Sequence, residues 1–175
     1  MKEKKFTINN AMYDKPMGDN DECYTPRYVV EAILPFIPKD KIIWCPFDKE
    51  DSFFVQVLLE NGYNVVFSHI DYGENFFTFE PKKWDIIVSN PPFTDKRAFF
   101  ERAFQLGKPF MLLMTAQWLN DSTPVKLYLQ YERDMELIHF TKRIQFLNTP
   151  KKGIPFKTLF YCSNILPKNN ILLNI

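Results

Sequence analysis

The sequence predicts a single α/β domain with a mostly parallel, twisted sheet, helices on both faces and a late antiparallel strand. Short apolar runs of strand length alternate along the chain with segments of helical periodicity, which is typical of parallel sheets. Several of these runs are unbroken, as expected for strands buried on both faces. The chain has 175 residues, of which 46% are hydrophobic, and this suffices for one domain with its own core.

The first part of the chain begins with a polar segment, residues 1–21, which we expect to be flexible or loosely docked against a domain spanning 22–175. Thr25 and Pro26 fit the cap and the first residue of a helix, which Pro35 would help to end. The next expected elements are an apolar strand at 41–45, a helix at 53–61 closed by Asn-Gly, and a strand at 64–68.

The second part continues the same alternation. An Ile-Ile-Val run marks a third strand at 85–89, which two prolines must end. Apolar residues at helical spacing predict a helix at 95–107, with Gly107 past its end. The remaining expected elements are a buried strand at 110–115, a short helix at 124–131 and late strands at 136–140 and 156–163.

The most informative motif follows the third strand and reads Asn90-Pro91-Pro92-Phe93. Ligands of open α/β sheets sit at the carboxyl ends of the strands, near the point where the strand order reverses. An amide and an aromatic ring at such an end could hold a planar group that bears an amino nitrogen. The segments expected at the same edge are 45–52 and 68–77, with 23–26 folding over it.

With this motif the sequence resembles the Rossmann-like, S-adenosylmethionine-dependent methyltransferases, in particular the N6-adenine nucleic-acid methyltransferases of phages and mobile elements. The resemblance covers roughly residues 22–165. It implies S-adenosylmethionine as cofactor and methyl transfer to the exocyclic N6 of adenine in nucleic acid, with DNA favoured over RNA. The implied catalytic residues are Asn90, Pro91, Pro92 and Phe93.

The resemblance also implies a set of cofactor contacts. The segment 23–26 resembles the family's N-terminal cofactor segment, 44–48 sits at its first cofactor loop, and 73–77 resembles the segment that touches the adenine ring. Asp71, after the second strand, is the candidate for binding the ribose hydroxyls. The implied contacts are Tyr24, Thr25, Pro26, Pro46, Phe47, Asp48, Asp71, Asn75 and Phe76.

Two features depart from the family pattern. The first loop is normally rich in glycine, which allows close approach of backbone to ligand, but 46–52 contains none. Only 71–77 separates the second strand from the motif-like Asn-Phe pair, which suggests that one strand of the family's sheet is missing.

Nucleic-acid binding would have to come from a local patch, because the net charge is only +1. The segment 141–157 carries basic residues and no acidic one, and further basic residues follow the catalytic motif. The candidate phosphate contacts are Lys96, Arg97, Lys142, Arg143, Lys151 and Lys152.

Other classes of site and location are less compatible with the sequence. Three scattered cysteines and two isolated histidines do not predict a metal site. We expect a cytoplasmic location with no membrane association, because signal-peptide and membrane-spanning patterns are absent. Two alternatives stay open: a methyltransferase acting on RNA guanine or protein glutamine, and a catalytically inactive protein that binds nucleic acid or a host protein. The oligomeric state and recognised sequence are not predicted.

Overall fold

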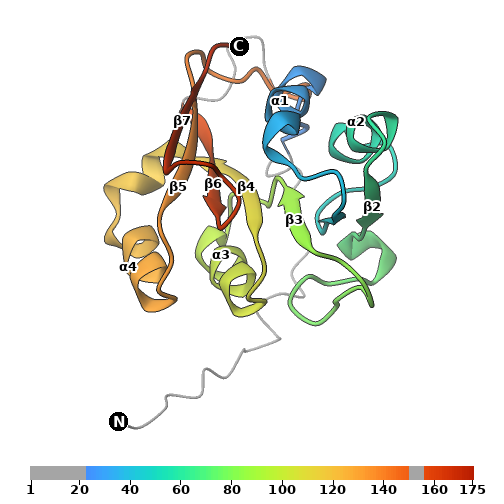
Figure 1. Cartoon of the computed structure of the whole chain (residues 1–175), viewed down its shortest axis with the longest axis horizontal. Coiled ribbons are helices and arrows are strands. Elements are labelled where there is room, and N and C mark those ends of the chain that lie inside the picture. The colour runs from blue at the N-terminus through green and yellow to red at the C-terminus, as the bar shows by residue number, and fades with distance from the viewer. Residues whose placement is uncertain (1–22, 150–155) are drawn as a thin grey trace, which may run out of the picture.

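The structure, a computed structural model, describes residues 23–149 and 156–175. Its strands are β1 (Ile42–Cys45), β2 (Asn64–Phe67), β3 (Ile86–Ser89), β4 (Phe110–Thr115), β5 (Glu136–Phe140), β6 (Thr158–Ser163) and β7 (Asn170–Leu173). The described residues thereby form one seven-stranded sheet in the order β2-β1-β3-β4-β6-β5-β7 (Figure 1). Neighbouring strands are parallel except where β6 runs antiparallel to β4 and β5. The predicted fold class is confirmed, including the late antiparallel strand.

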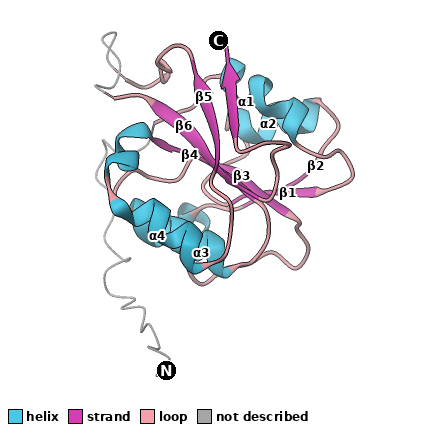
Figure 2. Ribbon diagram, turned by 60° about the vertical axis from the view of Figure 1, so that its left-hand side comes forward, coloured by secondary structure: helices cyan, strands magenta, loops and turns pink. Residues whose placement is uncertain are grey.

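Helices cover both faces of this sheet (Figure 2). The helices are α1 (Arg27–Ile33), α2 (Phe53–Glu60), α3 (Lys96–Gln105) and α4 (Ser122–Gln130). Ile43 and Cys45 of β1 pack in the core under α1 and α2, whereas Trp44 between them packs in the core under α3 and α4. Successive side chains of a strand point to opposite faces, so β1 needs apolar residues at each of these positions.

Aromatic rings fill much of the core under α3 and α4. Phe100 of α3 is fully buried, and five aromatic rings surround it at centroid distances of 5.0–5.7 Å. These rings belong to Phe104, Phe110, Trp118, Tyr128 and Tyr161. Their mostly edge-to-face geometry is the arrangement that aromatic quadrupoles favour. Part of the high phenylalanine content therefore serves packing, and Trp118 is a core residue.

The sheet differs from the sequence-based prediction at one edge and agrees with it at the other. β7 was not predicted; it adds to β5 in parallel and ends the sheet on that side. At the other edge lies β2, and the described residues 68–85 that follow it form one short 3-10 helix, η3 (Ile70–Tyr72), before β3. This agrees with the interpretation that one strand of the family's sheet is missing.

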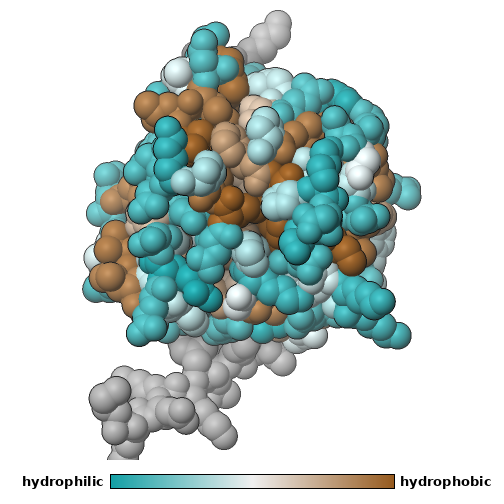
Figure 3. Space-filling view, in the orientation of Figure 1, coloured by the Kyte–Doolittle hydropathy of each residue, from teal (hydrophilic) through white to brown (hydrophobic). Residues whose placement is uncertain are grey.

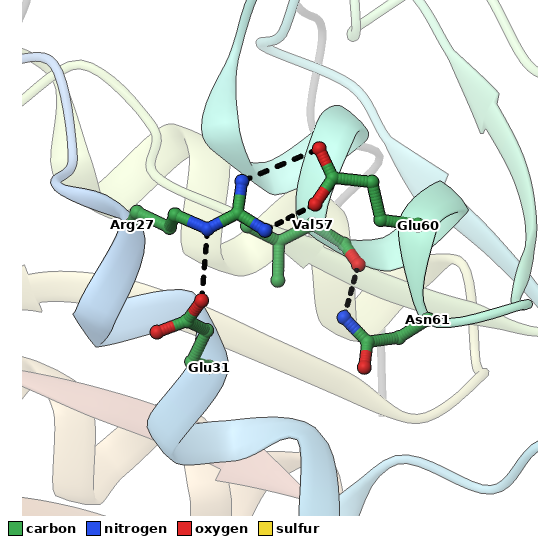
Figure 4. Close-up of polar contacts among 5 residues, drawn as sticks. All are labelled: Arg27, Glu31, Val57, Glu60 and Asn61. Atoms are coloured by element: carbon green, nitrogen blue, oxygen red, sulfur yellow. Dashed lines mark hydrogen bonds and ion pairs between the residues drawn. The ribbon is translucent and has the colours of Figure 1, made fainter.

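The start of α1 is fixed against α2 by charged side chains (Figure 4). The Arg27 guanidinium binds the Glu31 carboxylate at 2.8 Å and both carboxylate oxygens of Glu60. The prediction that Thr25 caps this helix is wrong. Pro26 is the N-cap residue, and the Thr25 hydroxyl instead accepts a hydrogen bond from the Asn90 side chain.

Hydrophilic residues cover most of the face seen in Figure 3, and hydrophobic residues gather near its centre. This distribution is ordinary, because polar groups cannot cover the whole surface of a folded chain. Among the helices in the described part of the chain, none is long and apolar enough to span a bilayer.

Candidate active site

The order of the strands reverses between β1 and β3, which are neighbours in the sheet. The chain leaves β1 toward β2 on one side and later enters β3 on the other. The loops after β1 and β3 therefore begin side by side at the carboxyl edge of the sheet, the position where open α/β sheets bind ligands. A hydrogen bond joins the two places directly: the hydroxyl of Ser89, at the end of β3, donates to the carboxylate of Asp48, in the loop after β1.

Asp48 is a buried carboxylate at this reversal point. Its side chain accepts hydrogen bonds from the hydroxyls of Ser52 and Ser89. Ser52 is also the N-cap of α2 and accepts from the backbone N–H of Phe54 at 3.2 Å. Burial raises the pKa of Asp48 to about 6, although the two hydroxyl donors act to lower it. The first loop thus carries a carboxylate whose charge is poorly solvated.

Asn90 presents an acceptor that has no donor. Its Nδ2 donates to the Cys23 carbonyl oxygen at 2.8 Å and to the Thr25 hydroxyl at 3.2 Å. A carbonyl oxygen can only accept, so the amide nitrogen must face Cys23 and the amide oxygen must point away. The Asn90 Oδ1 atom is buried and finds no hydrogen-bond partner among the described residues. Leaving such an atom unpaired costs about 1–3 kcal/mol, which points to a ligand that donates to it.

The segment that holds Asn90 is itself held from its other side. The backbone N–H of Tyr24 donates to Asn148 Oδ1 at 2.9 Å, and the Tyr24 carbonyl accepts from the N–H of Leu147 at 3.0 Å. Thr25 and Pro26 are buried, whereas 56% of Tyr24 is exposed. Residues 23–26 therefore lie between the Asn-Pro-Pro-Phe motif and the segment after β5, as a strap across the carboxyl edge.

The other three residues of the motif are held in place by packing. Pro91 and Pro92 are buried, and Phe93 is half-buried. The Phe93 ring packs edge-to-face with Phe146 and Phe156, at centroid distances of 6.3 and 5.5 Å. The two partner rings come from the segments on either side of residues 150–155. The ring expected to stack on a base is thus held by the late part of the chain.

The loop after β2 places Asp71 at the same edge. This residue is exposed in η3, and its carboxylate pairs with the Lys49 ammonium, which holds the pKa of Asp71 below its ordinary value. Its backbone N–H donates to His69 Nδ1 at 3.1 Å. Since Lys49 belongs to the first loop, the pair joins the loops after β1 and β2.

Two of the implied cofactor residues have structural contacts. The Asn75 side chain accepts from the backbone N–H of Phe77 at 2.9 Å and closes its own turn. Phe76 is only 3% exposed, and its ring lies 4.8 Å from that of Phe47 and 5.4 Å from that of Trp44. Phe47 is half-buried and Pro46 is buried. Cofactor contacts through these residues stay predictions.

The candidate phosphate contacts are spread along the carboxyl edge. Lys96 and Arg97 open α3, just after the motif, and the Arg97 guanidinium approaches Glu101 to 3.9 Å. Lys142 and Arg143 are exposed directly after β5. Lys151 and Lys152 lie outside the described residues.

The comparisons with known proteins concern the fold. No protein-family model matches the sequence, and no curated protein sequence does. A candidate RNA methyltransferase from Pyrococcus horikoshii is 15% identical with a TM-score of 0.52, and the match covers 87% of this chain and 92% of that one. A candidate class I S-adenosylmethionine-dependent methyltransferase from Listeria monocytogenes is 13% identical with a TM-score of 0.50, and the match covers 95% of this chain and 69% of that one. The chain has the Rossmann-like methyltransferase fold.

A larger protein is similar over part of its length. The modification subunit of a candidate type I restriction enzyme from Vibrio vulnificus is 14% identical, with a TM-score of 0.49. The match covers 90% of this chain and 48% of that subunit, so the chain spans about half of it.

Sequence reasoning missed the partners of the two central side chains. Ser52 and Ser89 were not identified, although a serine that closes an apolar strand directly before Asn90 was a usable signal. The contact between Thr25 and Asn90 joins residues 65 positions apart. Asn148, which holds Tyr24, carries no signal in the sequence. These contacts position the side chains of the candidate site.

Proposed function

We propose that the chain transfers a methyl group from S-adenosylmethionine to the exocyclic N6 of adenine in nucleic acid, with DNA the favoured substrate. The observation that carries this proposal is the buried and unpaired Asn90 Oδ1, at the point where the strand order reverses. An amino group would supply the donor that this oxygen lacks. The fold and the Asn-Pro-Pro-Phe motif support the choice of reaction.

The residues present fit the chemical groups of this cofactor. Its ammonium and ribose hydroxyls are donors, and the loops after β1 and β2 offer the carboxylates of Asp48 and Asp71. The exposed Tyr24 and the buried Thr25 border the same edge. The glycine-free first loop would thus bind the cofactor through its side chains, whereas the glycine-rich loop of the family lets the backbone approach the cofactor closely. When bound, the sulfonium supplies an activated methyl group.

The residues of the chain act mainly by positioning. The Asn90 Oδ1 and the Pro91 carbonyl oxygen would accept the two amino hydrogens, which aims the nitrogen lone pair away from the ring plane. Phe93 would stack on the base, held by Phe146 and Phe156. Orientation of this kind can supply a large part of a rate enhancement, and fixed acceptors need no reorganisation. In a duplex the base must also be flipped out of the stack, at a cost of a few kcal/mol.

One combined experiment tests the proposal. Calorimetric titration with S-adenosylmethionine and S-adenosylhomocysteine is expected to show binding of both. Incubation with labelled cofactor and DNA should place the label on N6-methyladenine after digestion. Label on RNA guanine or on protein glutamine would select one of those substrates instead. No cofactor binding and no transfer to any of these substrates would overturn the enzyme proposal and favour a binding protein.

Thr25 is expected to act as a positioning residue for Asn90. Thr25→Val keeps the shape of the side chain but removes the hydroxyl that accepts from Asn90 Nδ2. The loss of one such hydrogen bond should lower kcat about tenfold. The KM for the cofactor should change little, because the acceptor oxygen is displaced rather than removed.

Thr25→Ser is the matched control, since it keeps the hydroxyl, and it should retain most of the activity. Steady-state kinetics of both variants provide the measurement. Equal losses in the two variants, or a rise in KM without a fall in kcat, would contradict the positioning role.

A further inference from the structure

A hollow of the molecule lies on the outer part of the sheet, away from Asn90. It has a volume of about 580 Å3 and is bordered by β5, β6 and β7. We call it the outer groove and define it by His139, Lys157, Thr158, Lys168, Asn170 and Leu172. None of the predicted site residues lines it.

The helix α4 packs over β5 and β6, but no residue of β7 belongs to the core that it covers. Leu127 and Tyr128 of α4 pack in one core with Leu137 of β5 and Leu159 of β6. Leu172, on the next strand outward, is 78% exposed. The unpredicted strand β7 therefore widens the sheet beyond its helical cover and leaves part of its face open to a partner.

The lining of the groove is basic. Lys157 and Lys168 are exposed, and no carboxylate occurs among the lining residues. Within the described part of the chain, neither lysine ammonium pairs with a carboxylate. His139 Nε2 lies 3.3 Å from Asn170 Oδ1, which adds polar groups to the same surface. A hollow with two free ammonium groups and no opposing charge is complementary to an anionic partner.

One end of the groove reaches the carboxyl edge that holds the candidate active site. Thr115 at the end of β4 pairs with Thr158, so Lys157 lies at that edge. Asn170, which begins β7 and pairs with Leu137 near the start of β5, lies with Lys168 toward the opposite edge. The strands β6, β5 and β7 are two, three and four strands from β3. At about 4.8 Å per strand, the groove extends from roughly 10 to roughly 20 Å across the sheet from β3. Lys142 and Arg143 follow β5 at the carboxyl edge.

We infer that the outer groove binds the phosphate backbone of the nucleic acid whose base occupies the candidate active site. This inference rests on the proposed function and extends it to the nucleotides that flank the target base. At about 3.4 Å per step of a duplex strand, the separation corresponds to roughly three to six nucleotides from the target base. The groove therefore lengthens the footprint and adds affinity without reading sequence.

The test compares two lysine pairs in the full chain. Binding of a fluorescent 20-base-pair DNA duplex is measured by anisotropy over a series of salt concentrations. Replacing both Lys157 and Lys168 with Gln should weaken binding roughly tenfold near 0.1 M salt, and it should reduce the slope of log affinity against log salt by about 2. The matched control replaces Lys82 and Lys83, which are exposed in the segment before β3, and should leave both quantities unchanged.

Duplex length gives an independent readout. Wild type should bind the 20-base-pair duplex more tightly than a 6-base-pair duplex, and the Lys157→Gln, Lys168→Gln variant should lose most of that gain. Thermal unfolding checks that both variants are folded. An unchanged salt slope, or an equal effect of the control pair, would overturn the groove as a phosphate site. Binding of acidic peptides in place of nucleic acid would also overturn it.

Failure of the groove and failure of the proposed function have different signatures. The anisotropy measurement needs neither cofactor nor turnover. If S-adenosylmethionine binds and a short oligonucleotide is methylated while the salt slope stays unchanged, only the groove is excluded. If the duplex binds through the groove but no methyl transfer occurs, only the reaction is excluded.

Discussion

Asn90→Ala is expected to reduce methyl transfer by roughly 100- to 1,000-fold, the size of effect seen when one fixed hydrogen-bonding group of a catalytic site is removed. The substitution deletes the Oδ1 acceptor that has no partner within the described residues, so the substrate amine would lose its orienting contact. It also deletes the bonds from Nδ2 to Cys23 and Thr25. The loss of these two bonds destabilises the fold, whereas the removal of an unpaired buried oxygen stabilises it. Because the two effects partly cancel, we expect the free energy of unfolding to change by about 1 kcal/mol or less.

The measurement is single-turnover methyl transfer, with thermal unfolding and cofactor titration on the same samples. Asn148→Ala is the matched control, because it removes an amide that holds Tyr24 from the other side of the same segment. It should disturb the segment but leave the Asn90 acceptor in place, and it should cost much less activity. Full activity of Asn90→Ala would exclude the proposed chemistry. Loss of folding in that variant would instead assign Asn90 a structural role.

The elements at the centre of the sheet could be predicted because their sequence signals are strong. β4 is buried at all six positions, and it was predicted with the observed bounds. β7 escaped prediction for a physical reason: as an edge strand it buries only Ile171 of its four residues. Its place depends on pairing with β5, which lies about thirty residues earlier in the chain. Local pattern carries little information about such a strand.

The candidate site was predictable in its position but not in its contacts. The edge of the sheet followed from strand order alone. The orientation of the Asn90 amide depends on Cys23 and Thr25, which lie 67 and 65 positions away. The role of Phe76 depends on neighbours as well. The ring of Phe47 in the first loop lies 4.8 Å from that of Phe76. Phe76 is therefore part of the core, and its contact with the cofactor stays a prediction.

Asp48→Asn is expected to stabilise the chain at neutral pH. Burial raises the pKa of Asp48 to about 6 from an ordinary value of 3.8. The folded state then binds the Asp48 proton more tightly than the unfolded state does. The resulting stability is fully present below pH 3.8 and is lost as the pH rises through about 6. Above that range the ionised, buried carboxylate costs about 3 kcal/mol relative to its protonated form, a cost that an amide avoids.

Denaturant unfolding of wild type and Asp48→Asn from pH 4 to 7.5 provides the measurement. The quantity of interest is the difference in unfolding free energy between the two proteins, because other groups titrate equally in both. The pKa of Asp71 and of Glu60 is lowered, which alone would favour folding at higher pH, and these contributions cancel in the difference. The difference should shift in favour of the variant by up to about 3 kcal/mol across this range. A difference independent of pH would show that Asp48 titrates normally.

The same variant separates stability from function. If the Asp48 carboxylate has no role in cofactor binding, Asp48→Asn should bind the cofactor as wild type does. The amide can still bond to Ser52 and Ser89, because their hydroxyls can rotate to donate or accept. If Asp48 instead binds the ammonium of S-adenosylmethionine, wild type should bind the cofactor more tightly as the pH rises through about 6, and Asp48→Asn should lose that dependence. A variant that is more stable but binds the cofactor more weakly would show that the buried charge is kept for the ligand, at the expense of the fold.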